Sequence, residues 1–78
     1  MAKKVLVYST STCPYCKMAK QFLKDNAIEF TDFDVALDHQ KAEEMVAKSG
    51  QMGVPVLDIE GEIIIGFDRE AIKKALEI

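Results

Sequence analysis

Short apolar runs of strand length alternate along this chain with amphipathic patterns of helical period, and this alternation constrains the fold more than any other feature. Val5–Tyr8 is a continuous apolar run, which is typical of a buried central strand. In the helical pattern that follows, Ala19, Phe22 and Leu23 share one face. The same reasoning predicts strands over residues 5–8, 29–34, 55–59 and 62–66, and helices over residues 14–25, after Asp38 and after Asp68. The predicted order is therefore β-α-β-α-β-β-α.

The connections between these elements predict a mixed sheet. The first two strands flank a helix, so we expect them to be parallel and joined by a right-handed crossover. Glu60-Gly61 is a tight turn, so the two strands beside it are expected to be antiparallel. Each helix has one apolar stripe and is expected to cover a sheet face. The 78 residues therefore predict one α/β domain over residues 1–78, with a four-stranded mixed sheet flanked by three helices.

The charge balance of the chain limits its partners. Its net charge is −3 and its pI is near 5.0, which argues against nucleic acid and anionic membranes, because both select a basic face. No stretch approaches the roughly 20 apolar residues that span a bilayer, and Met1–Tyr8 lacks the longer apolar region and cleavage site of a signal peptide. We therefore expect a cytoplasmic protein, in which cysteines more often serve catalysis or metal binding than a structural disulfide.

Cys13-Pro14-Tyr15-Cys16 is the motif that carries chemistry. Two intervening residues at a helix start keep both sulfurs within bonding reach, and Cys13 falls where free N–H groups and the helix dipole favour a thiolate. Pro14 suits the first helical position, since its missing N–H costs nothing there. Cys16 is expected to lie about one turn into the helix and to be more buried. The motif predicts that Cys13 attacks a disulfide and that Cys16 resolves the mixed disulfide.

A pair of cysteines at this spacing is also found in metal sites. Zn²⁺ requires four ligands, whereas the chain offers no further cysteine and a single histidine, His39, which is expected to be solvated. No metal site within one chain is therefore predicted. A metal ion or iron–sulfur cluster held by Cys13 across a dimer stays open as a function of another class, although we expect a monomer.

The segment Val5–Lys17 resembles the active-site segment of glutaredoxins, in which Cys-Pro-Tyr-Cys is the typical dithiol motif. The resemblance continues through Ser49-Gly50, Val54-Pro55 and Gly66-Phe67-Asp68, so it covers essentially the whole chain. It implies the thioredoxin fold and a thiol–disulfide oxidoreductase that reduces protein or glutathione mixed disulfides without a bound cofactor. It also implies that Pro55 is cis and faces the cysteines, and that the backbone N–H and C=O of Val54 pair with an extended substrate.

Glutathione recognition is implied by the same resemblance, but only in part. The positions that match the substrate or glutathione site are Tyr15, Val54, Pro55, Gly66, Phe67 and Asp68. Asp68 would take the γ-glutamyl ammonium of glutathione, or else only cap a helix. Three positions depart from the family pattern: Gly53 stands where threonine is usual, Phe67 where glycine is usual, and Thr10 where a lysine often binds the glycyl carboxylate.

Gly66-Phe67 also resembles the corresponding pair of NrdH redoxins. These glutaredoxin-like proteins accept electrons from thioredoxin reductase and donate them to ribonucleotide reductase. Phe67 is expected to narrow the γ-glutamyl pocket and to add an apolar surface for a protein, whereas Pro14-Tyr15 between the cysteines favours a glutaredoxin. Glutathione and thioredoxin reductase therefore both stay open as electron donors, with disulfide-containing proteins as substrates.

Residues outside these motifs are expected to support the fold or the charge of the site. Tyr8 is expected to pack at the end of the first strand. Gln51 and the Glu43-Glu44 pair are expected to be solvated, although Gln51 could weakly contact a carboxylate. Lys17 and Lys20 are expected to add positive potential near the cysteines.

Overall fold

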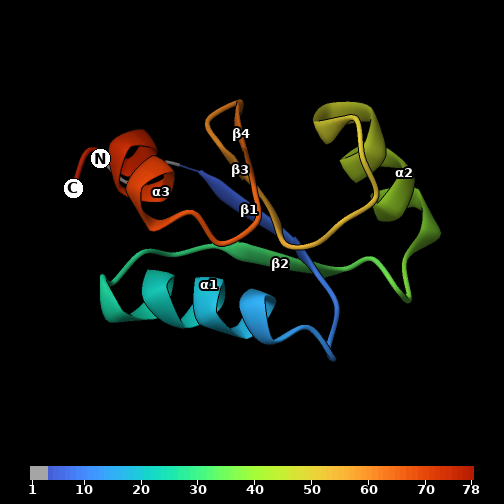
Figure 1. Ribbon diagram of the computed structural model, residues 1–78, viewed down its shortest axis with the longest axis horizontal. Coiled ribbons are helices and arrows are strands. Elements are labelled where there is room, and N and C mark those ends of the chain that lie inside the picture. Colours follow the sequence, from blue (N-terminus) through green and yellow to red (C-terminus); the bar gives the residue numbers. More distant parts are fainter. Residues whose placement is uncertain (1–3) are drawn as a thin grey trace.

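The computed structural model describes residues 4–78 and contains four strands and three helices in the predicted order (Figure 1). The elements are β1 (Val5–Ser9), α1 (Pro14–Asp25), β2 (Thr31–Asp34), α2 (His39–Ser49), β3 (Val56–Ile59), β4 (Glu62–Ile65) and α3 (Arg69–Leu76). The helix predicted over residues 14–25 is confirmed. The prediction that the second strand begins at residue 29 is wrong, because the pairing of β2 with β1 starts only at Thr31, opposite Leu6. Pro55 and Gly66 likewise lie just outside the strands that were predicted to include them.

The four strands form one mixed sheet in the order β2-β1-β3-β4. β1 runs parallel to β2 and antiparallel to β3, and β3 runs antiparallel to β4. Glu60 and Gly61 connect β3 to β4 with φ values of 52° and 90°, as a two-residue type I′ turn requires. The predicted pairing is therefore confirmed.

The helices cover both faces of the sheet, with α1 and α3 on one face and α2 on the other (Figure 1). The core under α1 and α3 contains Val5, Val7, Ala19, Leu23, Leu57, Ile59, Ile64, Ile72, Ala75 and Leu76. The smaller core under α2 is built on Tyr8, Met45 and Val56. Because the two central strands are covered on both sides, they are made of nearly continuous apolar runs.

The predicted helix caps are confirmed. Asp38 Oδ1 accepts a hydrogen bond from the Lys41 N–H at 3.2 Å, and Asp68 Oδ1 accepts one from the Ala71 N–H at 3.1 Å. Gly50 ends α2 in the left-handed conformation, with φ of 75°. These contacts satisfy backbone groups that a helix end would otherwise leave unpaired.

A polar network that the sequence did not predict ties α2 to the sheet. The buried Tyr8 hydroxyl donates to a Glu44 carboxylate oxygen and accepts from Lys48 Nζ at 2.9 Å. Lys48 Nζ also lies 2.7 Å from Asp58 Oδ2, and this hydrogen bond is the main cause that raises the pKa of Lys48. Tyr8 is buried, as expected, but the expectation that Glu43-Glu44 is a solvated pair is wrong for Glu44.

Candidate active site

The two cysteines lie where β1 leads into α1, and both are free thiols. After a turn over residues 10–12, Cys13 takes the position immediately before the helix, with extended backbone angles (φ −90°, ψ 114°). The Cys13 N–H donates to the Thr10 carbonyl at 3.4 Å, and Pro14 is the first helical residue. The predicted place of Cys13 at the amino terminus of this helix is confirmed.

The groups around the Cys13 sulfur determine how easily this thiol ionises. Its Sγ accepts from the Cys16 N–H at 3.3 Å and lies 3.9 Å from the Val54 carbonyl oxygen, to which the thiol form donates. Burial by itself would raise the pKa of Cys13. Hydrogen bonds from the Cys16 side chain and from the backbone of Cys16 and Tyr15, together with the charge of Lys20, outweigh burial and lower this pKa.

Cys16 is fully buried on the sheet-facing side of α1. Desolvation, followed by its hydrogen bond with Cys13, raises the pKa of Cys16 to about 11. A backbone hydrogen bond from Thr10 and the charge of Lys20 act in the opposite direction without reversing this shift. One helix start therefore holds two thiols of different acidity, and Cys13 is the one that ionises more readily.

Lys20 is the cation that the structure brings to both thiols. It follows Cys16 by one helical turn, so the two side chains share a face of α1. Its Nζ lies 3.0 Å from Asp32 Oδ2 and 3.5 Å from Ser9 Oγ, and Ser9 Oγ donates to Asp32 Oδ1 at 2.6 Å. Lys17 is exposed and is not among the main causes of the pKa shift of either cysteine. The sequence did not distinguish the two lysines, because Lys17 follows Cys13 by four residues just as Lys20 follows Cys16. The pairing of Lys20 with Asp32 had no signal in the sequence.

The loop between α2 and β3 meets Cys13 through the Val54–Pro55 peptide bond. This bond is cis, as the resemblance implied. Pro55 is buried and its carbonyl accepts from the Gly66 N–H at 2.8 Å, which places the segment after β4 beside this loop. The structure therefore brings together Cys13, Val54, Pro55 and Gly66, and the pairing of Val54 with a substrate stays a prediction.

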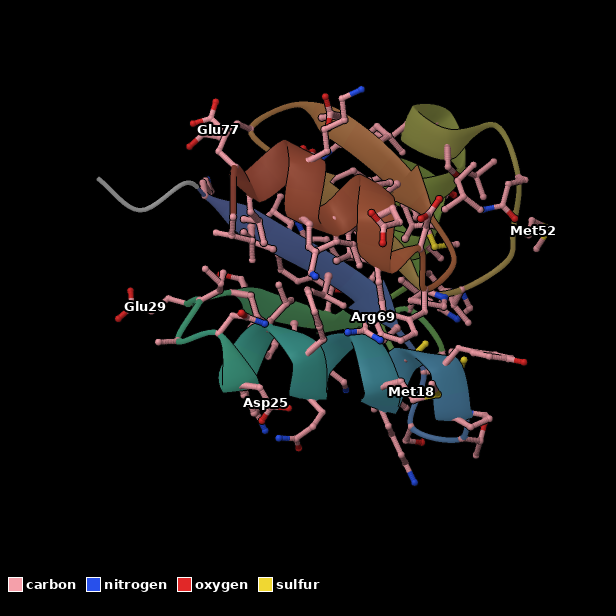
Figure 2. All side chains as sticks on the ribbon, turned by 60° about the vertical axis from the view of Figure 1, so that its left-hand side comes forward. Met18, Asp25, Glu29, Met52, Arg69 and Glu77 are labelled. Atoms are coloured by element: carbon pink, nitrogen blue, oxygen red, sulfur yellow. The ribbon has the colours of Figure 1, made fainter. Side chains whose placement is uncertain are left out.

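Phe67 and Asp68 follow Gly66 and lead into α3. The Phe67 ring packs edge-on against Phe22 of α1, with ring centroids 6.0 Å apart. The Asp68 carboxylate caps α3, so of its two expected roles the helix cap is the one observed. Figure 2 shows Arg69 above α1, where its guanidinium lies 5.7 Å from the centre of the Phe22 ring. Phe67 thus contributes to an apolar surface between α1 and the start of α3.

The side chains between the cysteines and in the loop before β3 differ in exposure. Tyr15 is 60% exposed and Met52, which points away from its loop in Figure 2, is 82% exposed. The expectation that Gln51 is merely solvated is wrong, because its carboxamide is hydrogen-bonded to the backbone of Gly53. No pattern in the sequence pointed to this contact.

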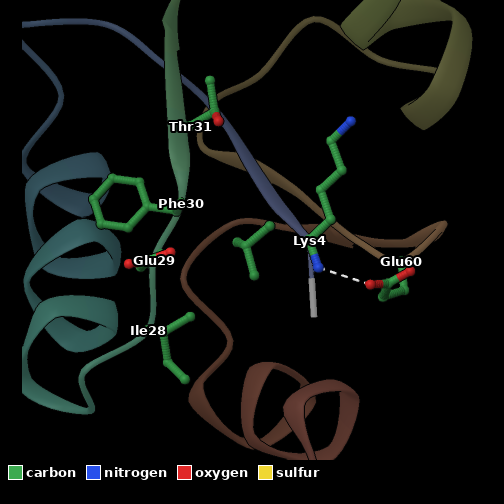
Figure 3. Close-up of a pocket in the computed structure, with 7 residues that line it drawn as sticks. Lys4, Ile28, Glu29, Phe30, Thr31 and Glu60 are labelled. Atoms are coloured by element: carbon green, nitrogen blue, oxygen red, sulfur yellow. Dashed lines mark hydrogen bonds between the residues drawn. The ribbon is translucent and has the colours of Figure 1, made fainter. Parts of the chain in front are cut away.

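Other parts of the described chain do not compete with this site. A hollow of about 680 Å³ lies at the opposite end of β1, between Lys4, Ile28, Phe30 and Glu60 (Figure 3). Its lining contains no thiol or imidazole. Within residues 4–78, no three His, Cys, Asp or Glu side chains gather as a metal site would need, and no helix is long and apolar enough to cross a membrane.

Comparison with known proteins identifies the relatives of the chain. The family model for glutaredoxin matches residues 5–64. An uncharacterized glutaredoxin-like 8.6 kDa protein in the rubredoxin operon of Clostridium pasteurianum is 48% identical over 73 residues, which cover 94% of this chain and 97% of the relative. The crystal structure of a glutaredoxin from Archaeoglobus fulgidus has a TM-score of 0.89 at 28% identity, covering 97% of this chain and 88% of that one.

The NrdH-redoxin of Escherichia coli is also similar in structure, with a TM-score of 0.84, and 91% of this chain and 92% of that one are covered. Its identity of 21% means that this likeness shows the fold alone. Together, the family match, the relatives and the neighbours confirm the thioredoxin-like fold and the family that the Cys-Pro-Tyr-Cys segment resembled. The chain belongs to the glutaredoxin family, whose members are thiol–disulfide oxidoreductases.

Proposed function

We propose that this protein reduces disulfides with Cys13 as the nucleophile and Cys16 as the resolving thiol. The observation that carries the proposal is the Cys13 sulfur at the amino terminus of α1, where its pKa is lowered and the Val54 carbonyl lies beside it. The thiolate is the reactive species in thiol–disulfide exchange. A thiol that ionises readily next to a buried second thiol has the properties that both steps of the reaction need.

The reaction consists of two exchanges. The Cys13 thiolate attacks one sulfur of the substrate disulfide, the substrate S–S bond breaks, and the other sulfur leaves as a thiolate that takes a proton from water. Cys16 then loses its proton, attacks the Cys13 sulfur of the mixed disulfide and expels the second substrate thiol. Two electrons have passed to the substrate, and the protein is left with a Cys13–Cys16 disulfide.

The order of the two exchanges follows from the acidity of the thiols. In the mixed disulfide Cys13 carries no charge, so one of the causes that raise the pKa of Cys16 is removed. Lys20 remains, and its charge favours the Cys16 thiolate. Cys16 therefore ionises more easily at the step in which it is needed.

Substrates in this proposal are disulfide-containing proteins or glutathione mixed disulfides. In this proposal they bind across Tyr15, Val54 and the turn from Gly66 to Asp68. Two contacts support this: the Val54 carbonyl lies beside the Cys13 sulfur, and the Gly66 N–H donates to the carbonyl of the neighbouring Pro55. Glutathione acts as a co-substrate that reopens the Cys13–Cys16 disulfide, and no bound cofactor is required. We propose a cytoplasmic monomer.

A redoxin of NrdH type, reduced by thioredoxin reductase, is the second candidate. Phe67 favours it, because this ring stands where the family usually has glycine and packs on Phe22 beside the exposed Met18. An apolar surface of this kind suits a protein partner better than the charged ends of glutathione. The two candidates share the chemistry at Cys13 and differ in the electron donor.

Replacement of each cysteine tests the chemistry. Cys13→Ser is expected to abolish reduction of a glutathionylated peptide, whereas Cys16→Ser is expected to trap a mixed disulfide that mass spectrometry detects. Full turnover by the Cys13→Ser protein would refute the assignment of the nucleophile.

The electron donor is tested on the oxidised protein with two reducing systems: glutathione with glutathione reductase, and thioredoxin reductase with NADPH. Faster reduction by glutathione supports the glutaredoxin proposal, and faster reduction by the reductase supports the second candidate. NADPH consumption measures both systems on one scale.

A further inference from the structure

In the loop that precedes the cis peptide bond, the Gln51 side chain is hydrogen-bonded to the backbone of Gly53 and so closes the loop. Gln51 Oε1 accepts from the Gly53 N–H at 2.5 Å, and Gln51 Nε2 donates to the Gly53 carbonyl at 3.1 Å. A carboxamide offers one acceptor and one donor side by side, so it satisfies both backbone groups of Gly53 at once. Both backbone groups of Gly53 therefore have a hydrogen-bond partner within the loop.

Ser49 ties the closed loop to the end of α2. Its Oγ lies 2.7 Å from the Met45 carbonyl and 3.0 Å from the Gln51 carbonyl, and it accepts from the Gln51 N–H at 3.4 Å. Met45 is buried in the core under α2. The backbone of Gln51 is thus held by the helix while its side chain holds Gly53.

Gly53 is the residue that permits this closure. A Cβ at position 53 would lie 2.6 Å from Gln51 Oε1, which is closer than real Cβ contacts allow. Any side chain at this position would therefore displace the Gln51 carboxamide. Position 53, where the family usually has threonine, is glycine here, and the Gln51 side chain occupies the space that a larger residue would need.

We propose that Gln51 is a positioning residue that holds the backbone of Val54 beside Cys13 in the orientation that an extended polypeptide substrate needs. This inference rests on the disulfide reductase activity proposed above. Val54 directly follows Gly53, whose backbone Gln51 holds. The Val54 carbonyl oxygen lies 3.9 Å from the Cys13 sulfur.

The consequence is a preference for substrates with a peptide backbone. If a loop residue is already ordered before the substrate binds, less conformational entropy is lost on binding. The affinity for the substrate is then about tenfold higher. A small disulfide without a peptide backbone makes no use of Val54 and gains nothing from this order. Gln51 therefore affects peptide disulfides selectively.

The test compares a glutathionylated peptide, with several residues on each side of its cysteine, with a small aromatic disulfide. Gln51→Ala is expected to lower kcat/KM for the peptide about tenfold through KM, while the rate with the small disulfide and the thiolate titration of Cys13 stay unchanged. Gly53→Ala is expected to reproduce this loss, because the new Cβ displaces the carboxamide. The control Gln40→Ala changes an exposed glutamine in the first turn of α2 and is expected to match the unmodified protein on both substrates.

Gln51→Glu tests the loss of only one of the two hydrogen bonds between the side chain at position 51 and Gly53. A carboxylate still accepts from the Gly53 N–H but cannot donate to the Gly53 carbonyl, so the loss on the peptide is expected to be about threefold. Equal loss on both disulfides in Gln51→Ala, or no loss on either, would overturn the inference. So would full peptide activity in Gly53→Ala, because Gln51 would then act without the closed loop. If the unmodified protein reduces neither disulfide, the proposed activity itself fails, whatever the role of Gln51.

Discussion

Replacing Cys16 by alanine or by serine separates its hydrogen bond to Cys13 from its role as a thiol. Both variants lose the resolving thiol, but serine keeps an O–H that can donate to the Cys13 thiolate. The Cys16 side chain is the strongest of the groups that lower the pKa of Cys13. Because Cys16 is fully buried, water does not readily replace the donor that alanine removes.

The size of the effect follows from the strength of this hydrogen bond. A hydrogen bond to a charged group contributes about 1.5–3 kcal/mol, and one pKa unit corresponds to about 1.4 kcal/mol. Since Cys13 is only partly buried, the lower figure applies. The pKa of Cys13 is therefore expected to be about one unit higher in Cys16→Ala than in Cys16→Ser.

Which of the two variants attacks a disulfide faster depends on the pH. Below both pKa values the alanine variant holds about tenfold less thiolate, but its thiolate is more basic and more nucleophilic, with a Brønsted coefficient of about 0.4–0.5. Attack on a disulfide is thus expected to be about threefold slower than in the serine variant. Above both pKa values both thiols are ionised, and the alanine variant is expected to be about threefold faster.

The assay combines a titration of thiolate absorbance with stopped-flow attack on a small aromatic disulfide that releases a coloured thiol. The rate profiles of the two variants are expected to cross between the two pKa values. Identical titration curves would refute the reasoning. The backbone N–H groups of Cys16 and Tyr15 would then be the donors that acidify Cys13.

Two further predictions concern lysines. Lys20→Met is expected to raise the pKa of the nucleophilic thiol by about half a unit, so the reaction rate rises only at higher pH. Lys17→Met, as the control, should leave the pH–rate profile in place. Equal shifts in both variants would contradict the role of Lys20. Lys48→Met leaves the buried Asp58 carboxylate with the Gly61 N–H, a bond of 2.8 Å, as its remaining hydrogen bond, and is expected to lower the free energy of unfolding by about 2–3 kcal/mol, less than a fully buried pair would cost. Urea unfolding measures this loss, and a value near zero would show that the pair behaves as a surface ion pair.

The elements of the fold and the place of Cys13 followed from local patterns. The helix of residues 14–25, the caps at Asp38 and Gly50 and the turn at Glu60-Gly61 each depend on neighbours a few residues away, so their signals lie within short windows of sequence. The partly buried thiol at a helix start and the fully buried thiol one turn later follow from the same local geometry. The cis state of Pro55 followed from family resemblance, because a proline alone does not determine its isomer.

The sequence by itself therefore determined the order of elements, the parallel first pair and antiparallel last pair of strands, and the two cysteines that carry the proposed chemistry. Only the tertiary structure decided which side chains meet across elements. Lys20 pairs with Asp32, Lys48 links Tyr8 to Asp58, and the Gln51 carboxamide closes on Gly53. Such contacts depend on packing, strand register and side-chain rotamers, which leave no period in the sequence. The surroundings that tune and present Cys13 could therefore be assigned only once the chain was folded.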